Sequence, residues 1–261
     1  DGELRDPFKK LTTVFQMSEE MFFLHYGKDG CNRHVLIDEC RELFGEIYEQ
    51  IPELPFCNIW TAMQLSSRLP KGALFHMGVS NTRRCWNMFQ LPESVESACN
   101  VGCCGIDGCV STLVGASLVN PDRLCYVVVG DLTFFYDLNS LGNHHIGTNL
   151  RVMLVNNGRG TEFRLGIHHC NVFGDDADKY MAAAGHFGNK SPLLVKHYAE
   201  DLGFHYLSAT TKEEFMTALS NFTNPQLSDH SMILEVFTDS KDESEALYLM
   251  SHIQSDAKGM V

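Results

Sequence analysis

The stretch LCYVVVGD, residues 124–131, decides the fold of this 261-residue chain. Its continuous run of β-branched and aromatic residues is typical of a strand that is buried on both faces of a sheet. A stretch with helical periodicity follows at 132–144, and a second buried-strand pattern follows at 150–156. Strand, helix and strand of these lengths predict a right-handed parallel βαβ unit.

The same alternation continues along the rest of the chain, after a polar and partly extended entry. Apolar spacing predicts helices at 33–51, 57–69, 106–118, 132–144, 177–185, 191–202, 212–222 and 241–252, with a further helix start at Ser80. Strand patterns occur at 124–130, 150–156, 204–208 and 231–237, with a short apolar run at 72–78 and a further short segment at 97–101. We therefore expect an α/β fold: a doubly wound, mostly parallel sheet with helices on both faces and a ligand site at the carboxyl ends of its strands.

Composition limits the classes of function that are open to the chain. Hydrophobic residues make up 44% and charged residues 20%, which predicts a folded core. The net charge of -13 opposes binding to nucleic acid or to an anionic membrane surface. There is no apolar stretch of the roughly 20 residues needed to span a bilayer, and no secretory leader.

The ten cysteines are spread along the chain, mostly within apolar runs, and do not follow a secreted-domain spacing. We interpret them as reduced thiols and expect a cytoplasmic protein. Four of them lie close together in sequence, without a CxxC pair, and we interpret these as core thiols in preference to a zinc site. They are Cys99, Cys103, Cys104 and Cys109.

Polar residues with small neighbours follow both of the strongest strand patterns. Gly130-Asp131 follows the first, and Asn156-Asn157-Gly158-Arg159-Gly160 follows the second. Carboxylate, amide and carbonyl oxygens suit Mg²⁺, and glycines let the backbone approach phosphates near a helix N-terminus. Each segment by itself could be an ordinary turn or helix cap. Their joint occurrence after two buried strands favours a metal-bridged diphosphate site.

These residues resemble the motif of the thiamine diphosphate (ThDP) enzymes, in which a strand-terminal GD is followed, after one helix and one strand, by NN. Within that group the chain is similar to the family of the menaquinone-biosynthesis enzyme 2-succinyl-5-enolpyruvyl-6-hydroxy-3-cyclohexene-1-carboxylate synthase. The similarity is carried by Gly105-Ile106-Asp107-Gly108 with Ser111-Thr112, by Gly130-Asp131-Leu132-Thr133 with Tyr136-Asp137-Leu138-Asn139, and by Asn156-Asn157 through Phe163.

The resemblance implies a cofactor and its metal. Mg²⁺ would be bound by the side chains of Asp131 and Asn157 and by the carbonyl of Arg159, while Leu132 and Thr133 would meet the diphosphate. Ile106 would support the bent cofactor; by itself, it would be taken for a core residue. The complete implied cofactor site is Cys104, Gly105, Ile106, Gly130, Asp131, Leu132, Thr133, Asn157, Arg159 and Gly160.

The resemblance also implies a division of the chain and a missing half of the active site. Residues 1–30 would be the tail of a preceding middle domain or a linker, and residues 31–261 the cofactor domain. The chain has no initiator Met, and we expect it to be an excised or truncated piece. The family's catalytic Glu belongs to a separate pyrimidine-binding domain, so no catalytic residue is assigned here. We expect a homodimer or homotetramer and an inactive isolated chain.

The chain departs from the family at positions that bind substrate. Val101 and Trp86 stand where the family has arginines. Arg83 or Arg84 could substitute, and Asn81 and Phe163 are further candidates for substrate contact. Arg159 stands where the family has Gly; its carbonyl can still ligate if the loop does not need a positive φ, and its guanidinium could reach a phosphate or simply be solvated.

Two histidine pairs are ambiguous. His144-His145 could act as acid and base or could end a helix, and His168-His169 could cover the site or bind a metal. The resemblance implies decarboxylation of a 2-oxo acid and transfer of the resulting carbanion to an acceptor. A divergent decarboxylase, similar to acetolactate synthase, and a non-catalytic module that keeps the fold are the alternatives.

Overall fold

The computed structural model describes residues 4–27, 35–165, 168–180 and 191–253. The chain forms two compact units, residues 1–50 with 254–261, and residues 51–253, and we describe each by itself. The division predicted at residues 30 and 31 rests on the family resemblance and stays a prediction.

The described part of the first unit contains two helices, α1 (Glu19–Tyr26) and α2 (Val35–Glu49). Helix α2 confirms the helix predicted at 33–51. Helix α1 lies within the entry that was expected to be polar and partly extended, and it was not predicted. Ser18 caps its first turn by accepting a hydrogen bond from the Met21 amide (3.3 Å), and two acidic residues in that turn favour the positive end of the helix dipole.

The second unit contains a six-stranded sheet in the order β2-β1-β3-β4-β6-β5. All five strand pairings are parallel, which confirms the predicted fold class. The strands are β1 (Leu74–Met77), β2 (Glu96–Cys99), β3 (Cys125–Gly130), β4 (Leu150–Asn156), β5 (His205–Ala209) and β6 (Met232–Phe237). The α-helices are α3 (Asn58–Ser66), α4 (Asn81–Trp86), α5 (Cys109–Val119), α6 (Asp131–Tyr136), α7 (Ala177–Tyr180), α8 (Leu194–Asp201), α9 (Lys212–Phe222) and α10 (Ser240–Ser251).

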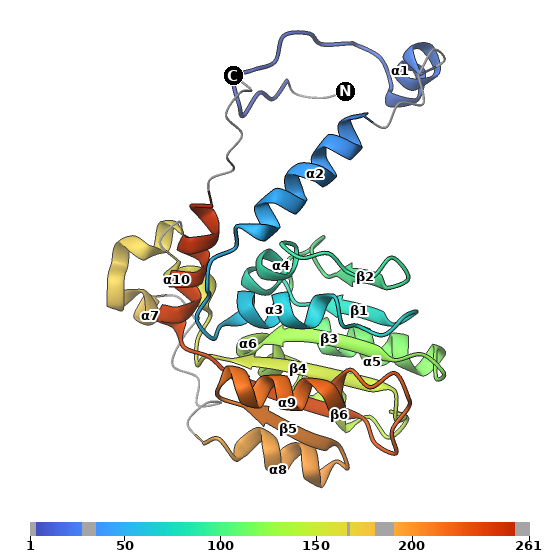
Figure 1. Cartoon of the computed structure of the whole chain (residues 1–261), viewed down its shortest axis with the longest axis vertical. Coiled ribbons are helices and arrows are strands. Elements are labelled where there is room, and N and C mark those ends of the chain that lie inside the picture. Colours follow the sequence, from blue (N-terminus) through green and yellow to red (C-terminus); the bar gives the residue numbers. More distant parts are fainter. Residues whose placement is uncertain (1–3, 28–34, 166–167, 181–190, 254–261) are drawn as a thin grey trace. The chain divides into compact units, whose positions relative to one another are not determined.

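Helices cover both faces of this sheet, as Figure 1 shows for α3 and α9 in front of the strands and α5 and α6 behind them. Successive strand residues point to opposite faces, so Tyr126 and Val128 join the core beneath α3, α4, α9 and α10. Val127 and Val129 join the second core, beneath α5, α6 and α8. The continuous apolar run at 125–129 is therefore explained by burial on both sides.

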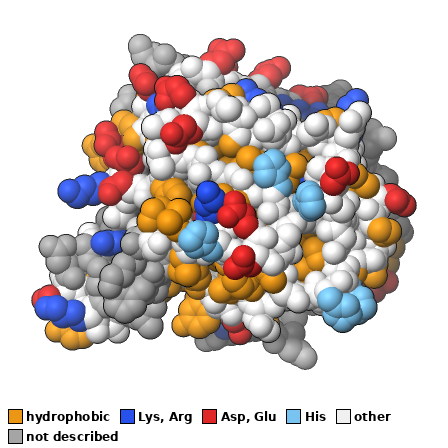
Figure 2. Space-filling view, turned by 90° about the horizontal axis from the view of Figure 1, so that it is seen from below, with side chains coloured by type: hydrophobic (Ala, Val, Ile, Leu, Met, Phe, Trp, Pro, Cys, Tyr) orange, Lys and Arg blue, Asp and Glu red, His pale blue; other side chains and the backbone are white. Residues whose placement is uncertain are grey.

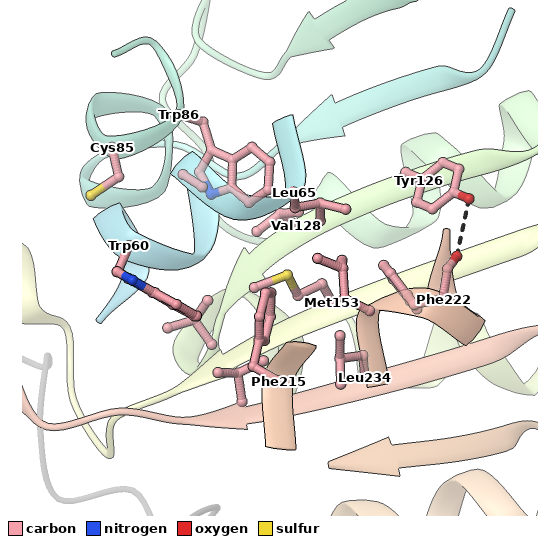
Figure 3. Close-up of a cluster of buried hydrophobic side chains, with 14 of the residues drawn as sticks. Trp60, Leu65, Cys85, Trp86, Tyr126, Val128, Met153, Phe215, Phe222 and Leu234 are labelled. Atoms are coloured by element: carbon pink, nitrogen blue, oxygen red, sulfur yellow. Dashed lines mark hydrogen bonds between the residues drawn. The ribbon is translucent and has the colours of Figure 1, made fainter. Parts of the chain in front are cut away.

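The first of these cores is rich in aromatic side chains (Figure 3). The rings of Trp60 and Phe215 meet edge to face with centroids 5.6 Å apart. Tyr126 packs against the ring of Phe222 and donates a hydrogen bond to the Phe222 carbonyl (3.1 Å), so its hydroxyl is satisfied although the residue is buried. These contacts fix α3 and α9 against the strands that carry the site.

The helix predicted at 132–144 is shorter than expected. α6 ends at Tyr136 and a 3₁₀ helix, η1 (Leu138–Gly142), follows. The Asp137 carboxylate accepts a hydrogen bond from the Ser111 amide (2.6 Å) at the start of α5, and this tertiary contact replaces continuation of the helix. Of the helix predicted at 177–185, the structure shows α7, and residues 181–185 lie outside the described residues.

The prediction of core thiols is wrong for two of the four cysteines. Cys109 is buried and Cys99 half-buried, but Cys103 and Cys104 are exposed because residues 100–107 form turns before α5 begins. In the described ranges, no three or more His, Cys, Asp or Glu side chains gather as metal ligands would.

Acidic and basic side chains are interspersed on the face of the molecule shown in Figure 2. Within the described part of the chain, no helix has the length and apolar character needed to cross a membrane.

Candidate functional site

A pocket of about 310 Å³ lies beyond the carboxyl ends of β3 and β4. The turn before α5 and the start of α4 complete its wall. Most residues predicted for the cofactor and substrate line it: Asn81, Cys104, Ile106, Gly130, Asp131, Leu132, Thr133, Asn157, Arg159, Gly160 and Phe163. Gly105, Arg83 and Arg84 are not among the lining residues. The structure thus brings together segments that the sequence separates, at the edge where an α/β sheet binds ligands.

Asp131 connects the two loops of the predicted motif. It is the first residue of α6, it is 2% exposed, and its Oδ1 accepts a hydrogen bond from the Leu132 amide (2.8 Å). Its Oδ2 accepts another from the Gly158 amide (2.6 Å) in the loop after β4. A short bond to an ionised carboxylate is among the stronger hydrogen bonds in proteins. The carboxylate therefore holds the ends of both strands together beside the pocket.

The two asparagines after β4 have different surroundings. The Asn156 amide nitrogen donates to the buried carboxylate of Glu235 (2.7 Å), which also accepts a hydrogen bond from the Tyr206 hydroxyl (2.7 Å). Burial raises the pKa of Glu235. Asn157 instead lines the pocket, and its Oδ1 accepts a hydrogen bond from the Arg159 amide (3.3 Å). The resemblance assigned only Asn157 to the metal, whereas the bond between Asn156 and Glu235 was not predicted.

The loop after Asn157 accommodates Arg159 in place of a glycine. Within this loop the positive φ (81°) belongs to Gly158, and Arg159 is not among the residues with positive φ. The condition for an Arg at this position is met, since only positive φ would demand glycine there.

Two other lining residues adopt a backbone conformation that is unusual for a side-chain-bearing residue. Cys104 has a φ of 51° and Ser80 a φ of 58°. Such conformations cost about 1–3 kcal/mol each and concentrate at functional sites. Beside Cys104, a Cβ on Gly105 would lie 2.8 Å from Asp107 Oδ1, a contact that the exposed Asp107 side chain could relieve by moving.

Glu243 on α10 is a residue near the site that sequence reasoning missed. It is 1% exposed, and its Oε1 accepts hydrogen bonds from the amide of Asn58 (3.0 Å) and the hydroxyl of Thr238 (2.8 Å). Burial raises the pKa of Glu243 to about 7. Asn58 lies 185 positions away in sequence and lines the pocket, so sequence spacing held no sign of this contact.

Comparison with known proteins gives the same enzyme repeatedly, although no family model matches the chain. The 2-succinyl-5-enolpyruvyl-6-hydroxy-3-cyclohexene-1-carboxylate synthase of Bacteroides fragilis is 32% identical over 253 residues, which cover 95% of this chain and 43% of that protein. The enzyme of the same name from Phocaeicola vulgatus is 31% identical, over 95% of this chain and 42% of its own length. That of Christiangramia forsetii is 33% identical over 199 residues, 76% of this chain and 33% of the relative.

Over nearly its whole length, this chain is therefore a homologue of part of these synthases. The resemblance seen in the motifs is confirmed, and it extends over nearly the whole chain. The chain spans less than half the length of the curated relatives it matches, 43% of the Bacteroides fragilis protein.

The two residues that stand at the positions of the family's substrate arginines, Trp86 and Val101, do not bring a positive charge to the pocket. Trp86 is 2% exposed, and its indole nitrogen donates to Asn58 Oδ1 (3.2 Å). Arg84 forms a two-pronged ion pair with Glu162 (2.7 and 2.8 Å), and this partner raises the pKa of Arg84 further. Arg83 is exposed and Val101 is uncharged. Glu162, which was not predicted, therefore brings a carboxylate to the pocket lining and neutralises Arg84.

The histidine pairs are in different places. The rings of His144 and His145 lie against each other at a tilt, with centroids 3.8 Å apart. His144 lines a hollow with residues that precede β4, β5 and β6, so it lies at the opposite end of the strands from the pocket. His168 contacts the ring of Phe163 (5.2 Å between centroids), so it reaches the pocket wall through that side chain. A catalytic role of either pair remains a hypothesis.

Proposed function

We propose that the chain is the diphosphate-binding part of a ThDP-dependent enzyme of the 2-succinyl-5-enolpyruvyl-6-hydroxy-3-cyclohexene-1-carboxylate synthase type. The proposed reaction is decarboxylation of a 2-oxo acid followed by carbon–carbon bond formation with an acceptor, as part of menaquinone biosynthesis. The observation that carries the proposal is the buried Asp131 carboxylate, which joins the two strand ends beside the pocket. The homology of the chain to part of these synthases supports it.

The residues of this pocket fit a magnesium diphosphate. Asp131 supplies one buried carboxylate, Asn157 an amide oxygen, and Arg159 would supply a backbone carbonyl. Mg²⁺ needs only one or two protein carboxylates when phosphate oxygens and water fill its other positions. Leu132 and Thr133, in the first turn of α6, would meet the diphosphate near the positive end of that helix.

The remaining lining residues would orient the cofactor and limit its exposure to water. Ile106 and Cys104 form the wall on the α5 side, where Ile106 would support the thiazolium ring. The bound cofactor would supply the electron sink for decarboxylation. We place the Glu that activates it on a pyrimidine-binding domain of a cytoplasmic homodimer or homotetramer, since none is assigned within this chain.

A divergent reaction is the second candidate, because substrate recognition has changed. Trp86 faces the core, Val101 is neutral and Arg84 is neutralised by Glu162. A substrate with fewer carboxylates than the synthase's own would need fewer cations. A decarboxylase similar to acetolactate synthase, or a module that binds ThDP without catalysis, would tolerate these changes.

Calorimetry of ThDP with Mg²⁺ on the full-length protein tests the proposed cofactor site. Asp131→Asn should weaken Mg²⁺-dependent ThDP binding at least tenfold, because it removes the charged ligand. Asp137→Asn is the matched control, since Asp137 is a buried carboxylate that bonds to Ser111 and is not among the lining residues. Equal ThDP affinity in the wild type and in Asp131→Asn would refute the metal assignment.

Turnover distinguishes the reactions. The full-length protein should release CO₂ from a 2-oxo acid in the presence of ThDP and Mg²⁺, and the isolated 261-residue chain should not. Turnover by the isolated chain would contradict the prediction that its catalytic Glu lies elsewhere. Carbon–carbon product from an added acceptor would favour the synthase reaction over simple decarboxylation.

A further inference from the structure

Glu243 lies directly behind the loop that carries the proposed metal ligands. The register of β4 and β6 pairs Asn156 with Phe237, and the Thr238 amide then donates to the Asn156 carbonyl (3.3 Å). Thr238 in turn donates its hydroxyl to Glu243 (2.8 Å). This chain of contacts sets the first turn of α10 beside Asn157, and α10 also packs against the 3₁₀ helix η2 (Thr161–Arg164) that follows the loop.

One oxygen of the Glu243 carboxyl accepts two hydrogen bonds, and the other accepts none. Oε1 accepts hydrogen bonds from both Asn58 and Thr238, whereas Oε2 is buried without a partner at hydrogen-bond distance. The contacts through Thr238 set the Asn157 side chain near this carboxyl, and a hydrogen bond from Asn157 would lower the pKa of Glu243 against the effect of burial. A buried acceptor without a partner is costly, and the nearby amide is the group that can satisfy it.

An asparagine amide has two ends, and only one can bind a metal. The oxygen ligates Mg²⁺, while the NH₂ group can only donate. In the structure, Asn157 Oδ1 already accepts a bond from the Arg159 amide (3.3 Å), so the oxygen is on the loop side. An acceptor placed near the nitrogen end would hold the amide in this orientation, as outer-shell partners do for other metal ligands.

We propose that Glu243 is a positioning residue, which offers its free carboxyl oxygen to the Asn157 amide nitrogen and thereby keeps the Asn157 oxygen turned toward the metal position. This role rests on the proposed function, because it requires that Asn157 be a metal ligand. It explains why a carboxyl is kept in a buried place behind the pocket wall, where it bonds to Asn58. Glu235 performs the corresponding task for Asn156, one residue earlier and inside the sheet.

Metal affinity of the full-length protein tests the proposal without relying on turnover. The dissociation constant of Mn²⁺ at saturating ThDP, measured by paramagnetic resonance of the free ion, should rise at least tenfold in Glu243→Leu, which has no acceptor. Glu243→Gln offers one acceptor oxygen where the carboxyl offers two, so the bonds from Asn58 and Thr238 and the bond from Asn157 cannot all be kept, and a similar loss is expected. Thr238→Val is the control, because it removes one bond to the same carboxyl and should lower stability without changing metal affinity.

A second variant at residue 157 separates positioning from general damage to the fold. Aspartate presents two equivalent oxygens and needs no orientation, so in an Asn157→Asp background Glu243→Leu should change Mn²⁺ affinity less than about threefold. If Glu243→Leu does not fold, Glu243→Asp takes its place. Its shorter side chain keeps the charge but withdraws the oxygen from Asn157, and the same tenfold loss is expected.

The possible failures can be told apart. Absence of Mn²⁺-dependent ThDP binding in the wild type would refute the proposed function together with this inference. Normal binding in the wild type, loss in Asp131→Asn and wild-type affinity in both Glu243→Leu and Glu243→Asp would overturn the role of Glu243 alone. An equal loss in Thr238→Val would also overturn it, since the effect would then follow stability.

Discussion

Replacing Trp86 by Phe should destabilise the second unit by about 2–4 kcal/mol. The indole nitrogen of Trp86 donates to Asn58 Oδ1 (3.2 Å), and both residues are only 2% exposed. Phe has no donor, so the Asn58 oxygen would stay buried without a partner, at about 1–3 kcal/mol. The smaller ring would also leave space beside Phe75, whose centroid lies 5.0 Å from that of Trp86, at about 1 kcal/mol more.

Urea unfolding followed by circular dichroism measures this loss, and the fluorescence of Trp60, the other of the two tryptophans, reports on the same core. A double-mutant cycle isolates the hydrogen bond. In an Asn58→Ala background, the Trp86→Phe change should cost at least about 1 kcal/mol less, because the unpaired acceptor has been removed. A Trp86→Phe protein within about 0.5 kcal/mol of the wild type, or strictly additive losses, would refute the reasoning.

The same contact explains why the family's arginine cannot be restored by one substitution. Trp86→Arg would place a guanidinium in an apolar core beside Phe75. Burying an unpaired charge costs several kcal/mol. The departure from the family at this position is therefore built into the packing of α4.

Three further predictions concern charge, pH and thiol reactivity. Glu162→Gln should release Arg84 from its ion pair and tighten binding of a small carboxylate such as pyruvate several-fold, as measured by calorimetry; unchanged affinity would show that Arg84 does not reach the substrate. Burial lowers the pKa of His76, so the folded state takes up its proton less readily than the unfolded state does. Stability should accordingly fall as pH drops below about 6.5, by at most about 1.4 kcal/mol per pH unit, and the slope should be smaller in His76→Gln. Cys104 is exposed, whereas burial raises the pKa of Cys109 to about 11; a thiol reagent at pH 8 should therefore modify Cys104 first, and equal rates would contradict the structure.

Much of the fold could be predicted because its strands are buried on both faces. The continuous apolar runs of β3 and β4 are typical of buried parallel strands, and the structure places both strands at the centre of the sheet. The segment at 97–101 was not assigned to a strand, because Glu96, Ser97 and Ala98 of the edge strand β2 are exposed and carry no apolar pattern. Helix α1 was missed for a related reason, since its apolar residues are consecutive and its start depends on the Ser18 cap.

The two loops of the candidate site could be predicted from the sequence, whereas the residues that surround these loops could not. Asp131 and Asn157 were found because residue type and position at a strand end suffice to suggest the chemistry. The partners of these loops come from far along the chain. Glu162 is 78 positions from Arg84, so no local spacing connects them, and only the tertiary fold brings α4 and η2 close enough for the pair to form.

The strand order has a consequence for how the site assembles during folding. Three strand pairs join residues close in sequence: Leu74 with Glu96, Cys125 with Leu150, and His205 with Met232. The other two joins are longer, and that between Arg151 and Met232 spans 81 positions. Closing so long a loop costs roughly 1 kcal/mol more entropy than closing one of 25 residues. The Asp131 and Asn157 loops can therefore meet within one local βαβ pair, whereas Glu243 reaches them only after the slowest joins of the sheet have formed.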